Sequence, residues 1–600
     1  MKISLGSWFL VVALCLAQWA SAATKNFAIT LTWENRTVAG ITRPMIHTNG
    51  QFPAPQLSLN QGDRVEFYIQ NNCPFSVTVH FHEILATGIE QRGTPWSDGT
   101  PGVSQRPIEQ GGSFLYQWNA DQYGAYFYHA HHRGQIDDGF YGPIYITPAS
   151  SVERPFDLIS NSSTDLKAMM EAEKNTSPIM LSDWKRYTSE QIWSSEEASG
   201  VDALCVNALL INGLGSVNCF SQAELAAFVN ETGLQSFLGN ETLTDLGCLP
   251  PDLVAAQGAF PHNYSALLPG MFYGCVPTEA SHALFNVNPA AQYVSWDLTS
   301  SAGVLEMIFS VDEHEVYVYA IDGRYIEPQV ADAVIVPNAN RYSVMVPLNK
   351  PAGDYTIRVA SASANQVVNV TATMHYEAAN KLNRPSNPWI TPAGINATEE
   401  TILFDESHVV PFPVVVPSTD VAATYFLDIG QTNASYVWKL ANQSFNIEYE
   451  ESQPLLFNES SIPSDLYIRT KNNTWIDFIL QVTTVGQPRH PIHKHSNKHF
   501  VIGQGNGTFN YSSVAEAMQF IPDSFNLKTP QYRDTSPTPL PVNEPTWLAI
   551  RYQVVNPGAF FMHCHIQMHQ SGGMALAILD GVDHWPIIPL EYRLDEAEAS

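Results

Sequence analysis

One eight-residue segment occurs twice in this chain, and this repeat constrains the fold more than any other feature. Residues 124–131 (GAYFYHAH) and 558–565 (GAFFMHCH) align without gaps, and each copy ends in two histidines separated by one residue. Each copy also follows an earlier histidine group, at residues 80–82 and 490–495. Two copies of one module that lie far apart indicate a chain assembled from repeated domains.

A cysteine lies between the two histidines of the second copy, and nearby residues complete a metal-binding set. Cys564, His569 and Met574 provide a thiolate, an imidazole and a thioether. A blue-copper electron-transfer centre uses two His and one Cys in a trigonal set with a weak axial Met. The first copy has other residues at the three aligned positions: Ala130, Gln135 and Phe140. Only the second copy can therefore build such a centre.

The tripeptide of residues 563–565 can serve two metal sites at once. In a strand, successive side chains point to opposite faces, so Cys564 faces one way while His563 and His565 face the other. The backbone between them is then a short covalent path for electrons from one site to the next. This arrangement favours redox catalysis over metal storage.

Four pairs of histidines with one residue between them give eight imidazoles, which suit a trinuclear copper cluster between two domains. They are His80, His82, His129, His131, His493, His495, His563 and His565. His490 then remains as the missing ligand of the blue-copper site. Any single pair can be explained as ordinary strand histidines, but the chain has only 19 His in 600 residues, so four matching pairs are improbable by chance. Structural zinc is disfavoured, since it closes with four ligands and needs no axial Met.

These motifs resemble those of the multicopper oxidases, the family of laccases, ascorbate oxidases and ferroxidases. The resemblance implies four copper ions per chain: one type 1, one type 2 and two type 3. It assigns His490, Cys564 and His569 to type 1 copper, with Met574 as the axial ligand. The other ligands would be His80 and His493 at type 2, His82, His129 and His565 on one type 3 copper, and His131, His495 and His563 on the other.

The same resemblance implies the reaction and a proton donor. A substrate gives up single electrons at type 1, and the trinuclear cluster collects four of them to reduce dioxygen to water. Asp98 lies where the family keeps an acid near the cluster, although a turn Asp before Gly99 explains it equally well. Two features depart from the family pattern: residues 83–87 intervene after the first histidine pair, and Gln567 replaces a common acid. The insertion would lie beside type 2 copper, and Asp98 would carry more of the proton delivery.

The sequence says less about the electron donor than about the copper ligands. Glu313 aligns with an acid that ferroxidase-type relatives place near type 1 copper to bind Fe²⁺. An acid there can also accept the proton of a phenol, or be a solvated turn residue. Within the family, Phe81, residues 93–99 and a cysteine-bearing insert resemble fungal laccase-like oxidases of pigment and secondary-metabolite pathways. That resemblance implies one-electron oxidation of phenols to aryloxyl radicals, with a small phenol and dioxygen as partners.

Three alternative functions are less well supported. A ferroxidase in its commonest fungal form carries a C-terminal membrane span, and this sequence has no apolar stretch of that length besides the one near residue 10. An ascorbate oxidase rests on one cysteine pattern alone. A non-catalytic secreted copper-binding protein would require an incomplete ligand set, and only the insertion at residues 83–87 supports that alternative.

Charge and targeting signals predict where the protein works. The net charge of −29 and the pI near 4.9 argue against nucleic acid and anionic membranes as partners. Residues 1–22 have the features of a secretory signal peptide. More than a dozen Asn-x-Ser/Thr sequons lie between the copper motifs, for example at Asn35, Asn161, Asn230, Asn369, Asn433 and Asn506. We therefore expect a secreted, N-glycosylated protein without a membrane anchor, in the extracellular space or the cell wall.

Five cysteines remain when Cys15 of the signal and Cys564 are set aside. Resemblance to ascorbate-oxidase-like relatives implies a disulfide between Cys205 and Cys219. Cys248 with Cys275 is then the second expected pair, and Cys73 is left unpaired.

Short runs of alternating apolar and polar residues, such as 27–33 and 64–69, recur between turn signals and predict an all-β fold. One sandwich is too small for this length, so we expect three cupredoxin-like Greek-key β-sandwich domains after the signal at 1–22, at residues 23–155, 156–385 and 386–600. The middle domain has no histidine pair and would space the outer two and wall the substrate pocket. Its insert at 219–275 has helical signals and is either a lid over type 1 copper or surface decoration.

Overall fold

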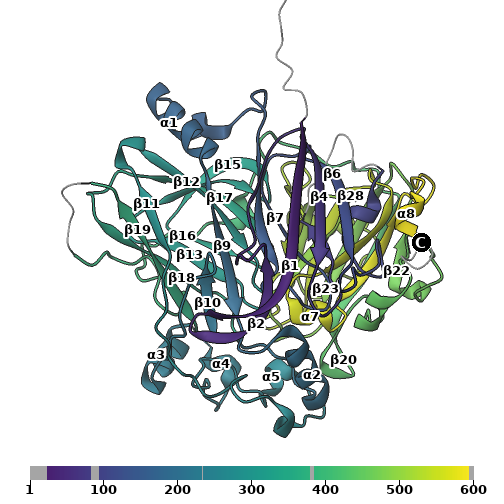
Figure 1. Cartoon of the computed structure of the whole chain (residues 1–600), viewed down its shortest axis with the longest axis horizontal. Coiled ribbons are helices and arrows are strands. Elements are labelled where there is room, and N and C mark those ends of the chain that lie inside the picture. The colour runs from purple at the N-terminus through teal and green to yellow at the C-terminus, as the bar shows by residue number, and fades with distance from the viewer. Residues whose placement is uncertain (1–22, 83–92, 233, 379–383, 594–600) are drawn as a thin grey trace, which may run out of the picture.

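The computed structural model describes residues 23–82, 93–232, 234–378 and 384–593. The expected signal peptide at 1–22 and the insertion at 83–87 lie outside these ranges. Within them the chain forms three pairs of β-sheets, and the all-β prediction is confirmed. In Figure 1 the purple strands of the first pair lie in the centre, with the teal second pair on the left and the green and yellow third pair on the right.

The first pair consists of two four-stranded sheets, ordered β2-β1-β4-β6 and β3-β8-β7-β5. The strands are β1 (Thr24–Val38), β2 (Ile41–Thr48), β3 (Leu57–Asn60), β4 (Arg64–Asn71), β5 (Val79–Phe81), β6 (Ser113–Asn119), β7 (Gly124–Ala130) and β8 (Tyr141–Thr147). β4 shows why these segments form strands. Val65, Phe67 and Ile69 are buried, whereas Tyr68 between them is 42% exposed, which is the period of two that the sequence predicts.

The second pair consists of a six-stranded sheet, β10-β9-β12-β17-β14-β15, and a five-stranded sheet, β11-β19-β18-β13-β16. The strands are β9 (Ser177–Trp184), β10 (Ala208–Ile211), β11 (Leu284–Val287), β12 (Tyr293–Ser300), β13 (Met307–Val311), β14 (Val316–Ile321), β15 (Arg324–Ala331), β16 (Ala333–Val336), β17 (Arg341–Pro347), β18 (Asp354–Ser361) and β19 (Asn369–Tyr376).

The third pair repeats this plan, with sheets ordered β21-β20-β23-β28-β25-β26 and β22-β30-β29-β24-β27. The strands are β20 (Ala423–Thr432), β21 (Ala434–Leu440), β22 (Tyr467–Arg469), β23 (Trp475–Val482), β24 (Pro491–Lys494), β25 (His499–Asn506), β26 (Gln531–Arg533), β27 (Thr535–Pro537), β28 (Thr546–Gln553), β29 (Gly558–Cys564) and β30 (Ala575–Asp580).

The repeated module has the same place in the first and third pairs. In the first, β5 pairs antiparallel with β7, so that His80 lies opposite His129. In the third, β24 pairs antiparallel with β29, so that His493 lies opposite His563. Each histidine group is therefore fixed beside its partner by a ladder of backbone hydrogen bonds.

Helices gather mainly in the insert and at one edge of the molecule. They are α1 (Ser163–Lys174), α2 (Ser189–Ser199), α3 (Gln222–Thr232), α4 (Gln235–Leu238), α5 (Val254–Gln257), α6 (Val514–Ala517), α7 (Gln567–Ser571) and α8 (Leu590–Arg593). Figure 1 shows α2, α3, α4 and α5 along the lower edge, below the sheets. The helical signal near residue 221 is thus confirmed by α3, which buries Leu225 and Val229 in a cluster of its own.

The two predicted disulfides are wrong, whereas the free thiol at Cys73 is confirmed. Cys205 pairs with Cys248, and Cys219 pairs with Cys275. Cys205 belongs to the core of the second sheet pair, but Cys219 packs with Cys275 in a separate apolar cluster. The sequence distance between Cys205 and Cys219 is short, but their side chains join different clusters. The Cys205–Cys248 disulfide ties the insert to the core of the second sheet pair, whereas the Cys219–Cys275 disulfide joins the two ends of the insert.

Candidate metal centre

A mononuclear site forms where β29, α7 and the residue before β24 meet. Cys564 Sγ lies 3.6 Å from His569 Nδ1 and 3.8 Å from His490 Nδ1, and the two Nδ1 atoms are 3.2 Å apart. All three side chains are buried. These separations match donor atoms that share one transition-metal ion at about 2.0–2.3 Å from each ligand. Two nitrogens and one thiolate sulfur are the donor set of a blue-copper centre.

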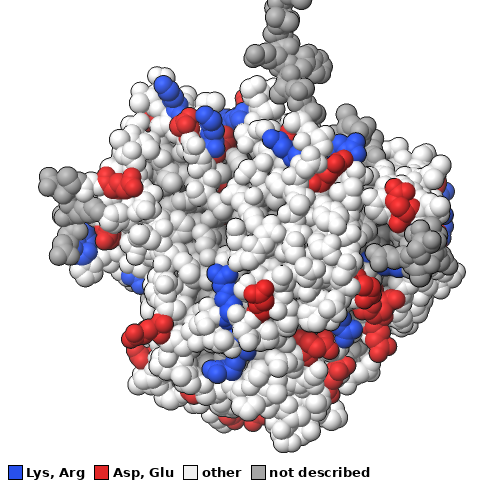
Figure 2. Space-filling model, viewed as in Figure 1, with Lys and Arg blue, Asp and Glu red and all other residues white. Residues whose placement is uncertain are grey.

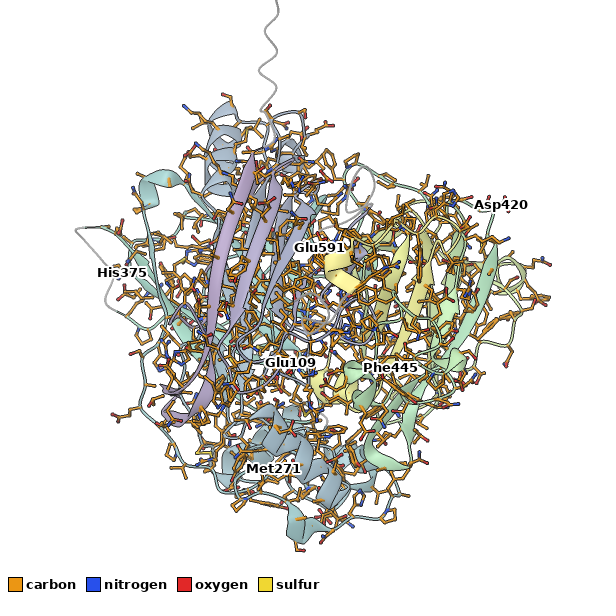
Figure 3. All side chains as sticks on the ribbon, turned by 45° about the vertical axis from the view of Figure 1, so that its right-hand side comes forward. Glu109, Met271, His375, Asp420, Phe445 and Glu591 are labelled. Carbon is orange, nitrogen blue, oxygen red and sulfur yellow. A yellow bond between two sulfur atoms is a disulfide. The ribbon has the colours of Figure 1, made fainter. Side chains whose placement is uncertain are left out.

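Met574 lies in the same apolar cluster as Cys564 and is fully buried. The Cys564 N–H donates to the Met574 carbonyl (3.1 Å), and the Met574 N–H donates to the His569 carbonyl (2.8 Å). Gly573 has a φ of +98°, and a Cβ there would lie 1.9 Å from Ser444 Oγ, so only glycine fits this turn. Phe445, labelled in Figure 3, lies beside the same turn and donates its backbone N–H to the Gly573 carbonyl (2.9 Å).

The eight histidines predicted as ligands of the trinuclear cluster meet between the first and third sheet pairs. Within each of three groups the donor atoms lie within 4.8 Å of one another: His80, His493 and His495; His82, His129 and His565; His131, His495 and His563. The Nε2 atoms of His131 and His495 lie 3.3 and 3.2 Å from Nε2 of His563. The structure thus brings together the residues that the sequence predicted as cluster ligands, in groups drawn from both modules.

Backbone carbonyls set which ring nitrogen of these histidines faces the centre of the cluster. Nδ1 of His80 donates to the Asp98 carbonyl (2.6 Å), and Nδ1 of His129 donates to the Ala130 carbonyl (2.8 Å). Nδ1 of His563 donates likewise to the Cys564 carbonyl (2.9 Å). A histidine that donates one ring N–H to a fixed acceptor presents the lone pair of the other nitrogen to a metal.

Unpaired ring nitrogens in the cluster indicate that a cation fits there. Nε2 of His82, His129 and His565 is buried without a hydrogen-bond partner among the described residues, although the three belong to one group. Leaving three buried polar atoms unpaired costs free energy that a shared metal ion would offset. Burial lowers the pKa of all ten histidines of both sites, so their imidazoles are neutral and able to bind metal.

Asp98 lies against the cluster, as predicted from its place in the sequence. Its Oδ2 is 3.0 Å from His495 Nδ1 and accepts a hydrogen bond from Thr100 Oγ1 (2.8 Å). Its Oδ1 is 3.7 Å from His80 Nδ1. Burial raises the pKa of this carboxyl above its ordinary value. Asp98 is therefore placed to hold a proton beside the histidine cluster.

Sequence reasoning missed a buried ion pair behind the cluster. Asp534 binds the Arg341 guanidinium through both oxygens, at 2.6 and 2.7 Å, and also accepts from Lys498 Nζ (2.7 Å). Arg341 Nη1 lies 3.2 Å from His82 Nδ1, and the Asp534 carbonyl lies 3.0 Å from His493 Nδ1. Burial alone would raise the pKa of Asp534, but the two cations hold it below its ordinary value. No motif singles out Arg341, since its partners come from distant parts of the chain.

Glu313 does not lie at the mononuclear site, which corrects the expected role. It occupies the turn between β13 and β14, and Arg384 Nη1 and Nη2 donate to its carboxylate at 2.5 and 2.7 Å. The Asn387 N–H donates to the same group (2.9 Å). The Arg384 hydrogen bond lowers the pKa of Glu313 to about 2. Of the three explanations offered for Glu313, the surface turn acid is the one that fits.

A different acid lies beside His569. Asp202 Oδ2 is 3.8 Å from His569 Nε2 and accepts a hydrogen bond from Trp438 Nε1 (3.2 Å). Asp202 and His569 border a cavity of about 230 Å³ with mostly apolar walls, including Phe237 and Leu249 of the insert. Burial raises the pKa of Asp202 to about 7. The signal that could have identified it is a single acid in the otherwise uncharged run of residues 198–221.

The insert therefore forms part of the cavity wall and is more than surface decoration, while its role as a lid stays a prediction. Asp202 is the only acidic or basic side chain other than His569 among the described residues that line the cavity.

On the face drawn in Figure 2, several acidic side chains lie near one another at the lower right, and the visible lysines and arginines form no continuous patch.

Comparisons with known proteins agree with the geometry. Three family models, each described as multicopper oxidase, match residues 30–151, 175–379 and 437–584. The chain is 42% identical to laccase abr2 of Aspergillus fumigatus, with 94% of this chain and 96% of the relative covered. It is 38% identical to multicopper oxidase MCE of Talaromyces pinophilus, with 97% and 98% covered.

A laccase structure from Botrytis aclada shares the fold at a TM-score of 0.69 and 21% identity, with 94% of this chain and 89% of that chain covered. The fold prediction of three cupredoxin-like domains is thereby confirmed, while the boundaries near 155 and 385 stay predictions. The histidine and cysteine groups fit copper, the metal of this family. This chain belongs to the multicopper oxidase family and is a copper-dependent oxidoreductase.

Proposed function

We propose that this protein is a secreted laccase-like oxidase that takes single electrons from phenols and uses dioxygen as the acceptor. The observation that carries the proposal is Asp202, a buried carboxylate next to His569 in a mostly apolar cavity. An apolar wall binds an aromatic ring, and a single acid orients its hydroxyl group. Four phenols supply four electrons and four protons, which together with one dioxygen give two waters and four aryloxyl radicals.

The metal assignment is part of this proposal. Four copper ions would be held by the two sites. His490, Cys564 and His569 would hold type 1, and Met574, which is buried in the same apolar cluster as Cys564, would be a further weak ligand. The cluster would take His80 and His493 at type 2, His82, His129 and His565 at one type 3 position, and His131, His495 and His563 at the other. Bound copper supplies the one-electron acceptor at the first site and the four-electron reduction of dioxygen at the second.

The chain's own residues handle binding and protons. Asp202 accepts the hydrogen bond of the phenol hydroxyl and takes its proton as the ring loses an electron. Trp438 packs against His569 with its ring tilted by 33° and the ring centroids 4.0 Å apart, and it holds the imidazole at the cavity wall. Asp98, beside His495, holds a proton for the oxygen atoms that become water. Because Asp202 and Asp98 lie at different sites, proton release and proton uptake are separated in space.

Ferrous iron is a weaker candidate donor. Fe²⁺ bound from water needs several oxygen ligands, and Asp202 is the only carboxylate among the described residues that line the cavity at His569. Glu313, the acid expected to bind Fe²⁺ in a ferroxidase, is paired with Arg384 instead. An ascorbate-oxidase activity rests on the Cys205–Cys219 pattern, and that disulfide is not formed.

Secretion is supported by two observations on the described residues. The described residues contain two disulfides, which form in oxidising compartments. Several sequon asparagines are exposed, as glycan attachment requires: Asn35, Asn161, Asn230, Asn433 and Asn506. No helix of the described chain has the length and apolar character of a bilayer span.

The test is oxygen uptake by the purified, copper-loaded protein with catechol and, in parallel, with Fe²⁺, while the blue absorption is followed. Fast uptake and bleaching with catechol are expected. A Cys564→Ser control should lose the blue absorption and the uptake together. Preference for Fe²⁺, or full activity in the Cys564→Ser protein, would contradict the proposal.

A further inference from the structure

A second cavity adjoins the one at His569. It has a volume of about 250 Å³, and Leu234, Val304, Leu540 and Ile566 line both cavities. The two spaces therefore form neighbouring lobes separated only by shared side chains. A single-ring phenol fits in the first lobe alone, so the second lobe needs a different explanation.

The walls of the second lobe carry an unpaired acid. Glu306 lines this lobe and not the first one. Its Oε2 is buried and has no hydrogen-bond partner among the described residues, while its backbone N–H is already bonded to Ser363 Oγ (2.9 Å). A buried carboxylate oxygen without a donor costs free energy that a ligand's hydroxyl group can recover. Burial raises the pKa of Glu306, and Arg489, which lines the same lobe, partly offsets this by favouring the ionised form.

The chain ties this acid to the segment that carries His569. The Gln567 N–H donates to the Gly303 carbonyl (2.7 Å), which joins the segment of Glu306 to α7. Glu306 follows Gly303 by three residues, so its backbone lies within about 11 Å of Gly303. This reach is comparable to the length of an aromatic molecule of two joined or fused rings.

We propose that the two lobes form one binding site for a polyphenol of at least two rings, whose near hydroxyl lies at Asp202 and whose far hydroxyl donates a hydrogen bond to Glu306. This inference rests on the proposed phenol oxidation and names its substrate class. The near ring loses the electron, because only the first lobe borders His569. The far ring contributes binding and orientation, so Glu306 is a positioning residue.

The experiment compares two probes that differ in one group. The molecules 4-hydroxybiphenyl and 4,4′-dihydroxybiphenyl have the same rings, but only the second carries a far hydroxyl. Binding is measured by calorimetry on the copper-loaded protein, fully reduced under argon so that neither probe is oxidised. A hydrogen bond to a charged group predicts about tenfold tighter binding of 4,4′-dihydroxybiphenyl.

Two variants and one control decide the assignment. Glu306→Met should abolish the tenfold preference, and Glu306→Gln should restore part of it. Glu153→Met, an exposed acid that lines neither lobe, should keep the preference. Ala362→Phe, which fills the second lobe only, should weaken both biphenyls at least tenfold and leave the KM of catechol unchanged.

The inference is overturned if the protein binds the two biphenyls equally, or if the preference persists in Glu306→Met. It is also overturned if Ala362→Phe leaves biphenyl binding unchanged. The Ala362→Phe result stands even where Glu306→Met fails to fold. Lack of oxygen uptake with every phenol would instead refute the proposed function, and the binding ratio would still decide whether the two lobes act as one site.

Discussion

Asp202 combines in one residue two properties that suit phenol oxidation, an ionisable oxygen and a position beside His569, a predicted copper ligand. Burial raises the pKa of its carboxyl to about 7, compared with about 3.9 for an exposed Asp. The group accepts a proton only when ionised. Phenol oxidation should therefore decline as the pH falls through about 7, because Asp202 becomes protonated.

Replacement of Asp202 by Asn tests this role. We expect kcat/KM for catechol to fall about a hundredfold, since a positioned general base contributes about 10²–10⁴, and the decline near pH 7 to disappear. Hexacyanoferrate(II), which gives an electron without a proton, is the control donor and should be oxidised at an unchanged rate. Equal losses with both donors would mean that Asp202 acts by holding His569 in place.

Met574 is a second residue whose role can be tested alone. Its thioether is the only weak axial donor in the predicted set, and a weak axial bond lowers the potential of a blue-copper site. Met574→Leu should raise the type 1 potential while the blue absorption is retained, as measured by redox titration. An unchanged potential would contradict the axial assignment.

At the scale of elements, the sequence predicts β29 but does not predict the disulfides of the insert. β29 could be predicted because its alternation of Cys564 and the flanking histidines is local and is repeated in β7. The disulfides of the insert could not, because spacing alone does not show that Cys205 and Cys219 join separate clusters. Local patterns fix strands and ligands, whereas pairings depend on contacts between distant segments.

The Cys219–Cys275 disulfide closes a loop with a sequence separation of 56 residues that contains part of the cavity wall. Its removal in a Cys219→Ser, Cys275→Ser double variant should lower the free energy of unfolding by about 4 kcal/mol, since the unfolded loop gains entropy. Urea denaturation measures the change, and the KM of catechol should rise as the wall loosens. Cys73→Ala, which removes a buried thiol but no disulfide, is the control, and an equal effect of both would refute this role.

At the scale of the whole molecule, Arg341 joins the three sheet pairs at the cluster. It comes from β17 of the second pair and donates to the Ala125 carbonyl of the first and to Asp534 of the third. None of the predicted copper ligands lies in the second pair, and the sequence predicts for that pair only a spacing role and a share of the pocket wall. Its contribution to the cluster could not be predicted, because a buried arginine is identified by its partners and not by its neighbours in the chain.

Arg341→Met should leave Asp534 short of one cation and lower the free energy of unfolding by about 3–5 kcal/mol. We also expect loss of type 2 copper, measured by electron paramagnetic resonance and by metal content. Arg551→Met is the matched control: it breaks the buried pair with Asp477 in the sheet of the third pair that carries none of the predicted ligands. Similar loss of type 2 copper in both variants would show a general effect of instability.

Much of the cavity wall comes from segments that carry no predicted copper ligand, although His569 itself borders the cavity. The ligands lie on the histidine strands and α7, whereas Phe237, Leu249 and Leu540 of the wall lie on the insert and on a loop. A lineage that inherits this architecture can thus exchange one electron donor for another by mutations in those outer segments. The oxygen chemistry, encoded elsewhere, passes to the descendants unaltered.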